Sequence, residues 1–171
     1  MDELKIGEEE ETEEIQSEEH QLKAARLQIE DKIKSGANWF FLIGILSVIN
    51  SLYVLFTKAE TGFIIASGIT RVIRNIVLQT GSDTIATALV LEILVALLFI
   101  LIGFLARNKH KWAFMAGVSI YILDALILLR ALDIFSIAFH IIILLFIFKG
   151  IRALKVFERI ERKGYITPGR M

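Results

Sequence analysis

Four long apolar segments restrict the fold of this chain more than any other feature. They cover residues 38–56, 84–106, 112–129 and 132–148, and each holds at most two ionisable side chains. A helix needs about 20 apolar residues to cross a hydrocarbon layer about 30 Å thick, and these segments reach or approach that length. A soluble domain of 171 residues, 55% of them hydrophobic, has too little interior to cover such segments. The sequence therefore predicts an integral membrane protein with an all-α, four-helix transmembrane bundle.

The third and fourth segments are separated only by a short link at about 130–131. A link of this length joins neighbouring antiparallel helices, so we expect these two helices to form a hairpin.

Charge is concentrated at the two ends of the chain. Residues 1–35 hold twelve Asp and Glu against five Lys and Arg. Like charges and few apolar groups predict a disordered acidic head at 1–18. Apolar residues then recur at helical spacing over 19–35, which predicts an amphipathic cytoplasmic helix leading into the membrane. Self-association or docking of a partner is an alternative role for that helix.

The opposite end of the chain is basic. Residues 149–171 hold seven Lys and Arg against two Glu, and apolar residues alternate with the cations. This pattern predicts that 151–171 form a basic amphipathic tail that continues the fourth span along the inner leaflet, where anionic lipids attract it. The acidic head of the same or a second subunit is another partner for this tail, and a homo-oligomer is compatible with that contact. Nucleic acid is not an expected partner.

Residues 62–79 are apolar but carry Arg71 and Arg74 on one stripe. Two arginines on one stripe oppose a spanning helix, because charged groups in the bilayer are costly. We therefore predict an interfacial helix between the first and second spans, with the two arginines covering the outer entrance of the bundle.

Orientation follows from the basic loops. Arg107, Lys109 and Lys111 lie between the second and third spans, and the tail is also basic. Positively charged loops stay in the cytoplasm. We therefore expect a multi-pass protein of the cell (inner) membrane, and four spans place both of its termini in the cytoplasm. The segment 57–83 and the link at 130–131 then face outward.

Each span carries one polar residue of interest: Asn50, Glu92, Asp124 and His140. At 1.5 Å per residue, all four lie about 8 to 12 Å inside the outer boundary. Ionisable groups at such depth are buried in the bundle, paired or functional. We expect one buried polar layer in the outer half of the bundle, with an ion pair or hydrogen bond between Asp124 and His140 across the hairpin.

Three interpretations of this layer stay open. The first is structural, because interhelical hydrogen bonds hold helices together. The second is a site that binds or conducts a proton or small cation, with Glu92 as the titrating group and Asp124 and His140 as its partners. The third is a metal-dependent intramembrane enzyme with Glu92, Asp124 and His140 as ligands, because two carboxylates and an imidazole suit Zn²⁺, Mn²⁺ or iron. A scaffold that recruits a partner through the charged termini is a further alternative.

Known catalytic patterns are missing from the sequence. The chain has no cysteine, which excludes thiol catalysis, disulfides and thiolate metal sites. The spans contain no HExxH, GxSxG or glycine-rich phosphate motif. The sequence therefore favours a protein that is not an enzyme, and it predicts no particular cofactor.

Four stretches resemble a group of small bacterial and archaeal four-span integral membrane proteins: NWFFLIGILSVINS (38–51), GIT (68–70), ARNKHKWAFMAGVSIYILDALILL (106–129) and FHIIILLFIFKGIRAL (139–154). The resemblance covers about residues 36–155, and its most specific part runs from Trp112-Ala113-Phe114 to Tyr121-Ile122-Leu123-Asp124. It implies a bacterial or archaeal cell membrane and carries no activity.

Overall fold

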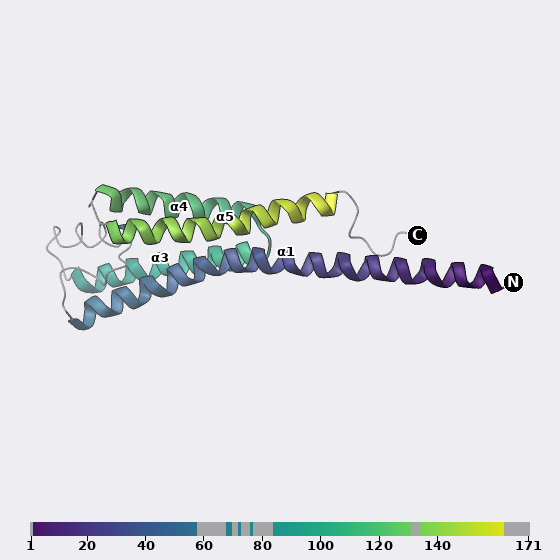
Figure 1. Cartoon of the computed structure of the whole chain (residues 1–171). Helices are drawn as coiled ribbons and strands as arrows, with labels where there is room; N and C mark the ends of the chain where they lie inside the picture. The colour runs from purple at the N-terminus through teal and green to yellow at the C-terminus, as the bar shows by residue number, and fades with distance from the viewer. Residues whose placement is uncertain are drawn as a thin grey trace.

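The computed structural model describes residues 2–57, 84–130 and 134–162, together with residues 68, 69, 72 and 76. In the three long ranges it forms α1 (Asp2–Thr57), α3 (Thr84–Arg107), α4 (Lys111–Arg130) and α5 (Ile134–Arg162). These helices lie side by side as an elongated bundle, and α1 projects far beyond the others at the end where α5 finishes (Figure 1).

Each of the four helices contains a segment long and apolar enough to cross a membrane. These segments are Gln16–Tyr53, Leu89–Arg107, Lys111–Arg130 and Ile134–Arg162. Large apolar side chains also stay exposed along the outer faces of the bundle, for example Leu97, Leu101, Phe104, Leu126 and Leu145. In a membrane these faces would contact lipid. The prediction of an all-α fold with four helices long and apolar enough to cross a membrane is confirmed for the described residues.

The helices pack in a closed order. α1 contacts α3 and α5, and α4 contacts α3 and α5. The predicted hairpin of the third and fourth spans is therefore confirmed as α4 and α5. Aromatic and aliphatic side chains fill the centre, where the rings of Phe40 and Phe114 lie 6.0 Å apart and Phe99, Ile143 and Ile147 are buried.

The closest approach between helices occurs where two glycines meet. A Cβ atom added to Gly36 on α1 would lie 2.5 Å from the Cα of Gly150 on α5, so the two backbones touch. Lipid tails are as apolar as leucine, and helices in membranes therefore associate through close packing at small residues. Gly117 on α4 also packs closely, against the ring of Phe40.

Replacement of Gly150 by alanine should destabilise the bundle, because the new methyl group meets backbone that cannot move aside. Overpacking of this kind costs about 1–3 kcal/mol, which a lower thermal unfolding temperature in detergent would report. Gly103→Ala is the matched control, since its Cβ would first meet the rings of Phe41 at 3.1 Å, and rings can rotate. Equal losses in the two variants would contradict the backbone contact.

α1 is a single helix where the sequence predicted three separate segments. It is one helix from Asp2 to Thr57, about 84 Å long at 1.5 Å per residue. Residues 2–18 are thus helical where we predicted a disordered head, and 19–35 is continuous with the first span. Glu, Gln, Lys and Ala are strong helix formers, and Lys23 pairs with Glu19 at 3.5 Å one turn away. Because proline is absent from α1, nothing in its backbone ends the helix.

The middle of α1, around Ile29 and Ile33, packs against the C-terminal end of α5. Ile33 on α1 is buried together with Ile151, Leu154 and Phe157 on α5, and Ile29 packs against them. The apolar stripe that we predicted to lie on the inner leaflet therefore faces α1 instead. The described part of α5 ends at Arg162, so residues 163–171 of the predicted tail lie outside the described residues.

Lys109 connects this helix pair to the loop between α3 and α4. Its Nζ donates to Glu30 Oε1 at 2.9 Å and lies 4.0 Å from the centre of the Phe157 ring. Lys109 adopts φ 66°, a left-handed conformation that favours glycine, and it closes the C-terminus of α3 with His110 N donating to Leu105 O. The contacts of the Lys109 side chain with Glu30 and Phe157 thus offset the strain of its left-handed backbone conformation.

Two substitutions separate these effects. Lys109→Ala keeps the strained backbone and loses both contacts, so we expect a loss of about 1–2 kcal/mol in the free energy of unfolding. Lys109→Gly loses the same contacts but relieves the backbone, which should recover about 1 kcal/mol relative to the alanine variant. Thermal unfolding of both variants in detergent measures the difference, and a glycine variant no more stable than the alanine variant would refute it.

Candidate functional site

The four polar residues predicted to lie in one layer are all buried. Asn50, Glu92, Asp124 and His140 are each at most 4% exposed, and they come from α1, α3, α4 and α5 respectively. Ser47, Ser51 and Ser136 are buried as well. Because a charged or polar group in contact with lipid is costly, these side chains turn into the bundle.

The packing of α3 against α1 gives the level of Glu92 in the bundle. A Cβ on Gly44 of α1 would meet the Ala96 carbonyl oxygen of α3 at 2.9 Å, which sets the register of these two antiparallel helices. Residues beyond Gly44 on α1 therefore face residues before Ala96 on α3. This register places Glu92 at the level of Ser47 and Ser51.

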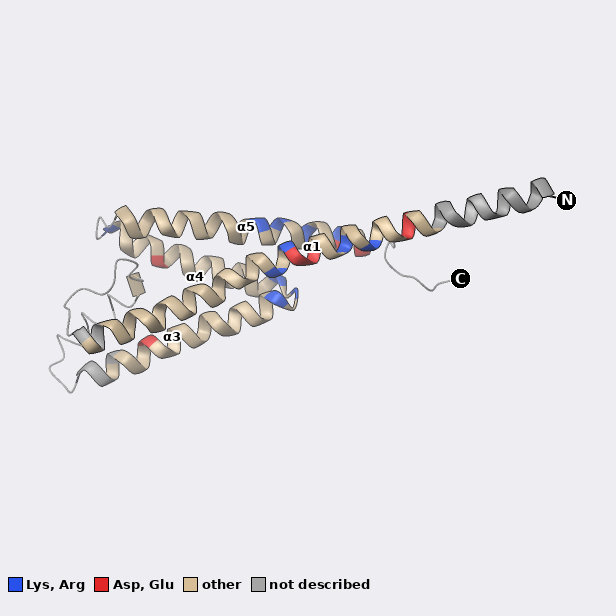
Figure 2. Ribbon diagram, turned by 60° about the horizontal axis from the view of Figure 1, so that its bottom comes forward, with Lys and Arg blue, Asp and Glu red and all other residues tan. Residues whose placement is uncertain are grey.

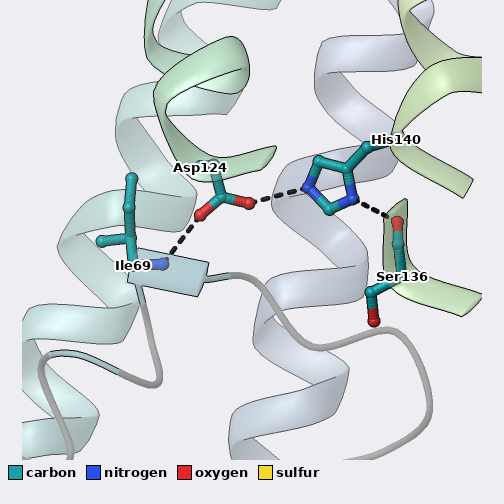
Figure 3. Close-up of polar contacts among 4 residues, drawn as sticks. All are labelled: Ile69, Asp124, Ser136 and His140. Atoms are coloured by element: carbon teal, nitrogen blue, oxygen red, sulfur yellow. Dashed lines mark hydrogen bonds and ion pairs between the residues drawn. The ribbon is translucent and has the colours of Figure 1, made fainter. Parts of the chain in front are cut away.

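Asp124 and His140 form the interaction that the sequence predicted across the hairpin. The distance from His140 Nε2 to Asp124 Oδ2 is 2.8 Å. The other ring nitrogen, Nδ1, lies 2.7 Å from the carbonyl oxygen of Ser136, one turn earlier on α5. The other carboxylate oxygen, Oδ1, accepts the backbone N–H of Ile69 at 2.7 Å, so both carboxylate oxygens and both ring nitrogens have a partner (Figure 3).

These contacts determine where protons lie. A carbonyl oxygen only accepts hydrogen bonds, so Nδ1 of His140 carries a proton and donates it to Ser136. The 2.8 Å contact needs a second proton between Nε2 and Oδ2, because two lone pairs repel at that distance. This proton belongs either to an imidazolium beside a carboxylate or to a carboxylic acid beside a neutral imidazole. In both arrangements the pair is neutral overall, which suits a buried site.

Tyr121 fixes the plane of the histidine. The two rings stack with their centres 4.4 Å apart and an angle of 12° between their planes, and Tyr121 meets Phe99 of α3 edge-on at 6.2 Å. Tyr121 and Asp124 lie three residues apart on one face of α4. The stack limits rotation of the imidazole away from Asp124.

A small cavity adjoins the pair on the side of α1. Its volume is about 20 Å³, and Ser47, Tyr121, Asp124 and His140 supply the polar part of its wall, with Ile43, Leu46 and Phe139 completing it. One turn farther along α1, Oδ1 of Asn50 has no hydrogen-bond partner among the described residues.

The three ligands of the predicted metal site are not assembled. Among the residues that the structure describes, no group of three His, Asp or Glu side chains could hold a metal ion. Asp124 and His140 meet each other, whereas Glu92 packs at the level of the α1 serines.

Sequence reasoning missed the contribution of Gly68 and Ile69. A main-chain N–H leaves no signal in a sequence, and only the glycine before it hints at a close approach. A Cβ on Gly68 would lie 2.6 Å from the carbonyl oxygen of Asp124 and 2.8 Å from Cβ of Ile127. Of the predicted interfacial helix 62–79, only Gly68, Ile69, Val72 and Ile76 are described, and each is helical. Arg71 and Arg74 lie outside the described residues, so their role as a cover stays a prediction.

Comparison with known proteins adds no assignment. No protein-family model matches this chain. No curated protein and no solved structure matches it either. Functional inference therefore rests on the site itself.

Substitution of Gly68 by alanine should displace the Ile69 amide from Asp124, because the new methyl group meets the backbone of α4. The lost hydrogen bond to the carboxyl group should cost about 1–3 kcal/mol and move the amide proton resonance of Ile69 upfield. Ile69→Ala is the control, since it trims the side chain and keeps the N–H. A Gly68→Ala variant in which the amide resonance of residue 69 stays in place would show that this contact does not depend on the glycine.

Proposed function

We propose that this integral membrane protein binds a proton at the Asp124–His140 pair and passes it through the outer half of the bundle. The observation that carries the proposal is the 2.8 Å contact between Nε2 and Oδ2, which requires one shared proton in a buried site. Histidine is the side chain whose unperturbed charge change falls between about pH 5 and 8. An ionisable pair that the bundle maintains at a cost in desolvation is a functional site by default.

The chemistry of the pair favours a proton over a metal cation. Hard cations take about six or more oxygen ligands. The pair offers two carboxylate oxygens, and each already accepts a hydrogen bond or shares a proton. A proton needs only one lone pair, and here it can lie between the lone pairs of His140 Nε2 and Asp124 Oδ2. Glu92, which we predicted as the titrating group, is buried elsewhere in the layer, and its role stays a prediction.

Orientation in the cell membrane is part of this proposal. α1 begins, α5 ends and the α3–α4 loop turns at the same end of the bundle, and Lys and Arg gather there (Figure 2). The positive-inside rule makes that end cytoplasmic. The Asp–His pair then lies toward the outer surface. The resemblance to small bacterial and archaeal four-span proteins supports a cell membrane.

The test uses purified protein in liposomes that trap a pH-sensitive dye, with the membrane potential clamped. We expect wild-type liposomes to acidify after an external acid jump, and Asp124→Asn and His140→Gln to slow that acidification about 100-fold, because a positioned proton-transfer group contributes at least that much. Ser119→Ala is the matched control on α4, since its hydroxyl is exposed and bonds only to Met115 O among the described residues.

Two outcomes would overturn the proposal. The first is wild-type acidification no faster than that of protein-free liposomes. The second is loss of acidification in Glu92→Gln with full activity in Asp124→Asn, which would assign the proton to Glu92. A sodium or potassium gradient at constant pH tests small cations in the same vesicles.

A scaffold is the second candidate function, and the projection of α1 favours it. The helix continues to Asp2, far beyond the end of the bundle, and most of its acidic residues lie on that projection (Figure 1). Such a helix presents a charged surface to a soluble partner in the cytoplasm. Deletion of residues 1–20 should release that partner while the spans stay folded, and retention of the partner would refute this role.

We also propose anionic lipid as a partner of the basic end. Lys149 stands over the ring of Phe146 at 4.9 Å, and the side chains of Arg152, Lys155 and Arg159 are exposed on α5. Lysines near a helix end extend to the headgroup level, where each cation near the surface contributes about 1 kcal/mol of attraction. Homo-oligomerisation through the charged termini remains part of the scaffold hypothesis.

A further inference from the structure

We propose that the cavity beside Asp124 and His140 binds one water molecule, anchored by the Ser47 hydroxyl, and that this water carries the proton to and from the pair. The inference rests on the proposed function and adds the route and the carrier. It explains how a proton reaches a pair whose side chains are almost fully buried.

The other faces of the pair are occupied. Nδ1 of His140 donates to Ser136 O, and Oδ1 of Asp124 accepts from Ile69 N. The ring of Tyr121 covers one face of the imidazole. The cavity is where both Asp124 and His140 border space that no protein atom fills. A proton that reaches the pair therefore arrives from the side of α1.

The size of the cavity selects the carrier. A water molecule needs at least about 10–15 Å³ of such space, and two to four polar partners. The cavity offers about 20 Å³ and polar wall residues on α1, α4 and α5, so it holds one water. A hydrated metal cation, which brings several waters, is too large for it.

The polar groups suit a water that gives and takes protons. The Ser47 hydroxyl can donate and accept, and each carboxylate oxygen of Asp124 has two acceptor sites. In the unloaded state, Asp124 is a carboxylate and His140 is neutral with its proton on Nδ1. A hydronium ion in the cavity then loses one proton to Asp124 Oδ2 and becomes water. The new O–H donates to Nε2, which gives the 2.8 Å contact, and release is the reverse step.

A second polar group on the same face of α1 extends the route. Asn50 lies three residues beyond Ser47, is 4% exposed, and has no hydrogen-bond partner for Oδ1 among the described residues. A buried acceptor of this kind commonly bonds to an internal water. Ser47 and Asn50 therefore mark a path along α1 toward the outer end of the bundle.

The test measures proton exchange at His140 in protein labelled with ¹⁵N-histidine. His140 is buried, whereas His20 and His110 are exposed, so its ring N–H signals can be distinguished by slow exchange with solvent. The ¹⁵N shifts over pH 4–10 report whether the pair titrates. The exchange rate of the ring protons reports access.

Three variants separate anchoring from filling. Ser47→Val adds a methyl group that occupies the cavity, and we expect exchange to slow by about tenfold or more with the titration midpoint little changed. Ser47→Ala keeps the space and removes the anchor, so about fivefold slowing is expected for one lost hydrogen bond. Ser51→Ala is the matched control, since Ser51 is buried one turn away, bonds to Ser47 O and does not line the cavity. Its exchange should equal that of wild type.

The outcomes distinguish the two proposals. If His140 titrates but exchanges at the wild-type rate in both Ser47 variants, the water route is wrong and the proton-binding pair stands. Equal slowing in Ser51→Ala also rejects the route, since it would trace the effect to α1 packing. If the His140 signals do not change over the whole pH range in wild type, the proposed function fails and the route fails with it. Ser47→Ala keeps the test valid if Ser47→Val does not fold.

Discussion

Backbone contact between α1 and α5 at Gly36 and Gly150 fixes how closely these two helices pack along their length. Only a residue without a side chain allows this approach, and van der Waals packing is the main attraction between helices in lipid. The pairing of α1 with α5 continues on both sides of these glycines. Toward the cytoplasmic end it joins Ile33 to Leu154 and Phe157, and toward the outer end it stacks Trp39 on Phe146 at 4.7 Å. Farther out, it brings Ser47 to the cavity beside Phe139 and His140.

The polar layer depends on this packing, and it contributes less to the stability of the bundle than the apolar core does. Interhelical hydrogen bonds in membranes are worth about 0.6 kcal/mol on average, which is small beside the burial of the aromatic core. Asp124 is nevertheless held at both carboxylate oxygens and His140 at both ring nitrogens. Such complete satisfaction positions a proton between two defined atoms, and the cavity leaves one side of the pair accessible. These properties are the support for the proposed proton binding.

Much of the fold could be predicted, and less of the site. The spans were readable because apolar length is imposed by the thickness of the bilayer. Burial of Asn50, Glu92, Asp124 and His140 followed from the cost of polar groups in lipid, and the Asp124–His140 contact followed from the short link between their helices. The Ile69 amide was not predictable, since every residue except proline carries the same N–H. Glu92 does not complete a three-ligand group with the pair among the described residues, and this depends on helix register, which single residues in a sequence do not reveal.

The ends of the chain also differ between what the sequence predicted and what the structure shows. Helix propensity was strong enough to carry α1 to Asp2, although the density of like charge led us to expect disorder. The sequence alone determined that four segments are long and apolar enough to cross a membrane, each with one polar residue of interest, because solvation by lipid acts on each segment separately. Tertiary structure alone decided that α5 pairs with α1 beyond the bundle, that the Ile69 amide meets Asp124, and that Ser47 lines the cavity beside the pair. These contacts join residues far apart in the chain, and their distances depend on how closely the glycines let the helices approach.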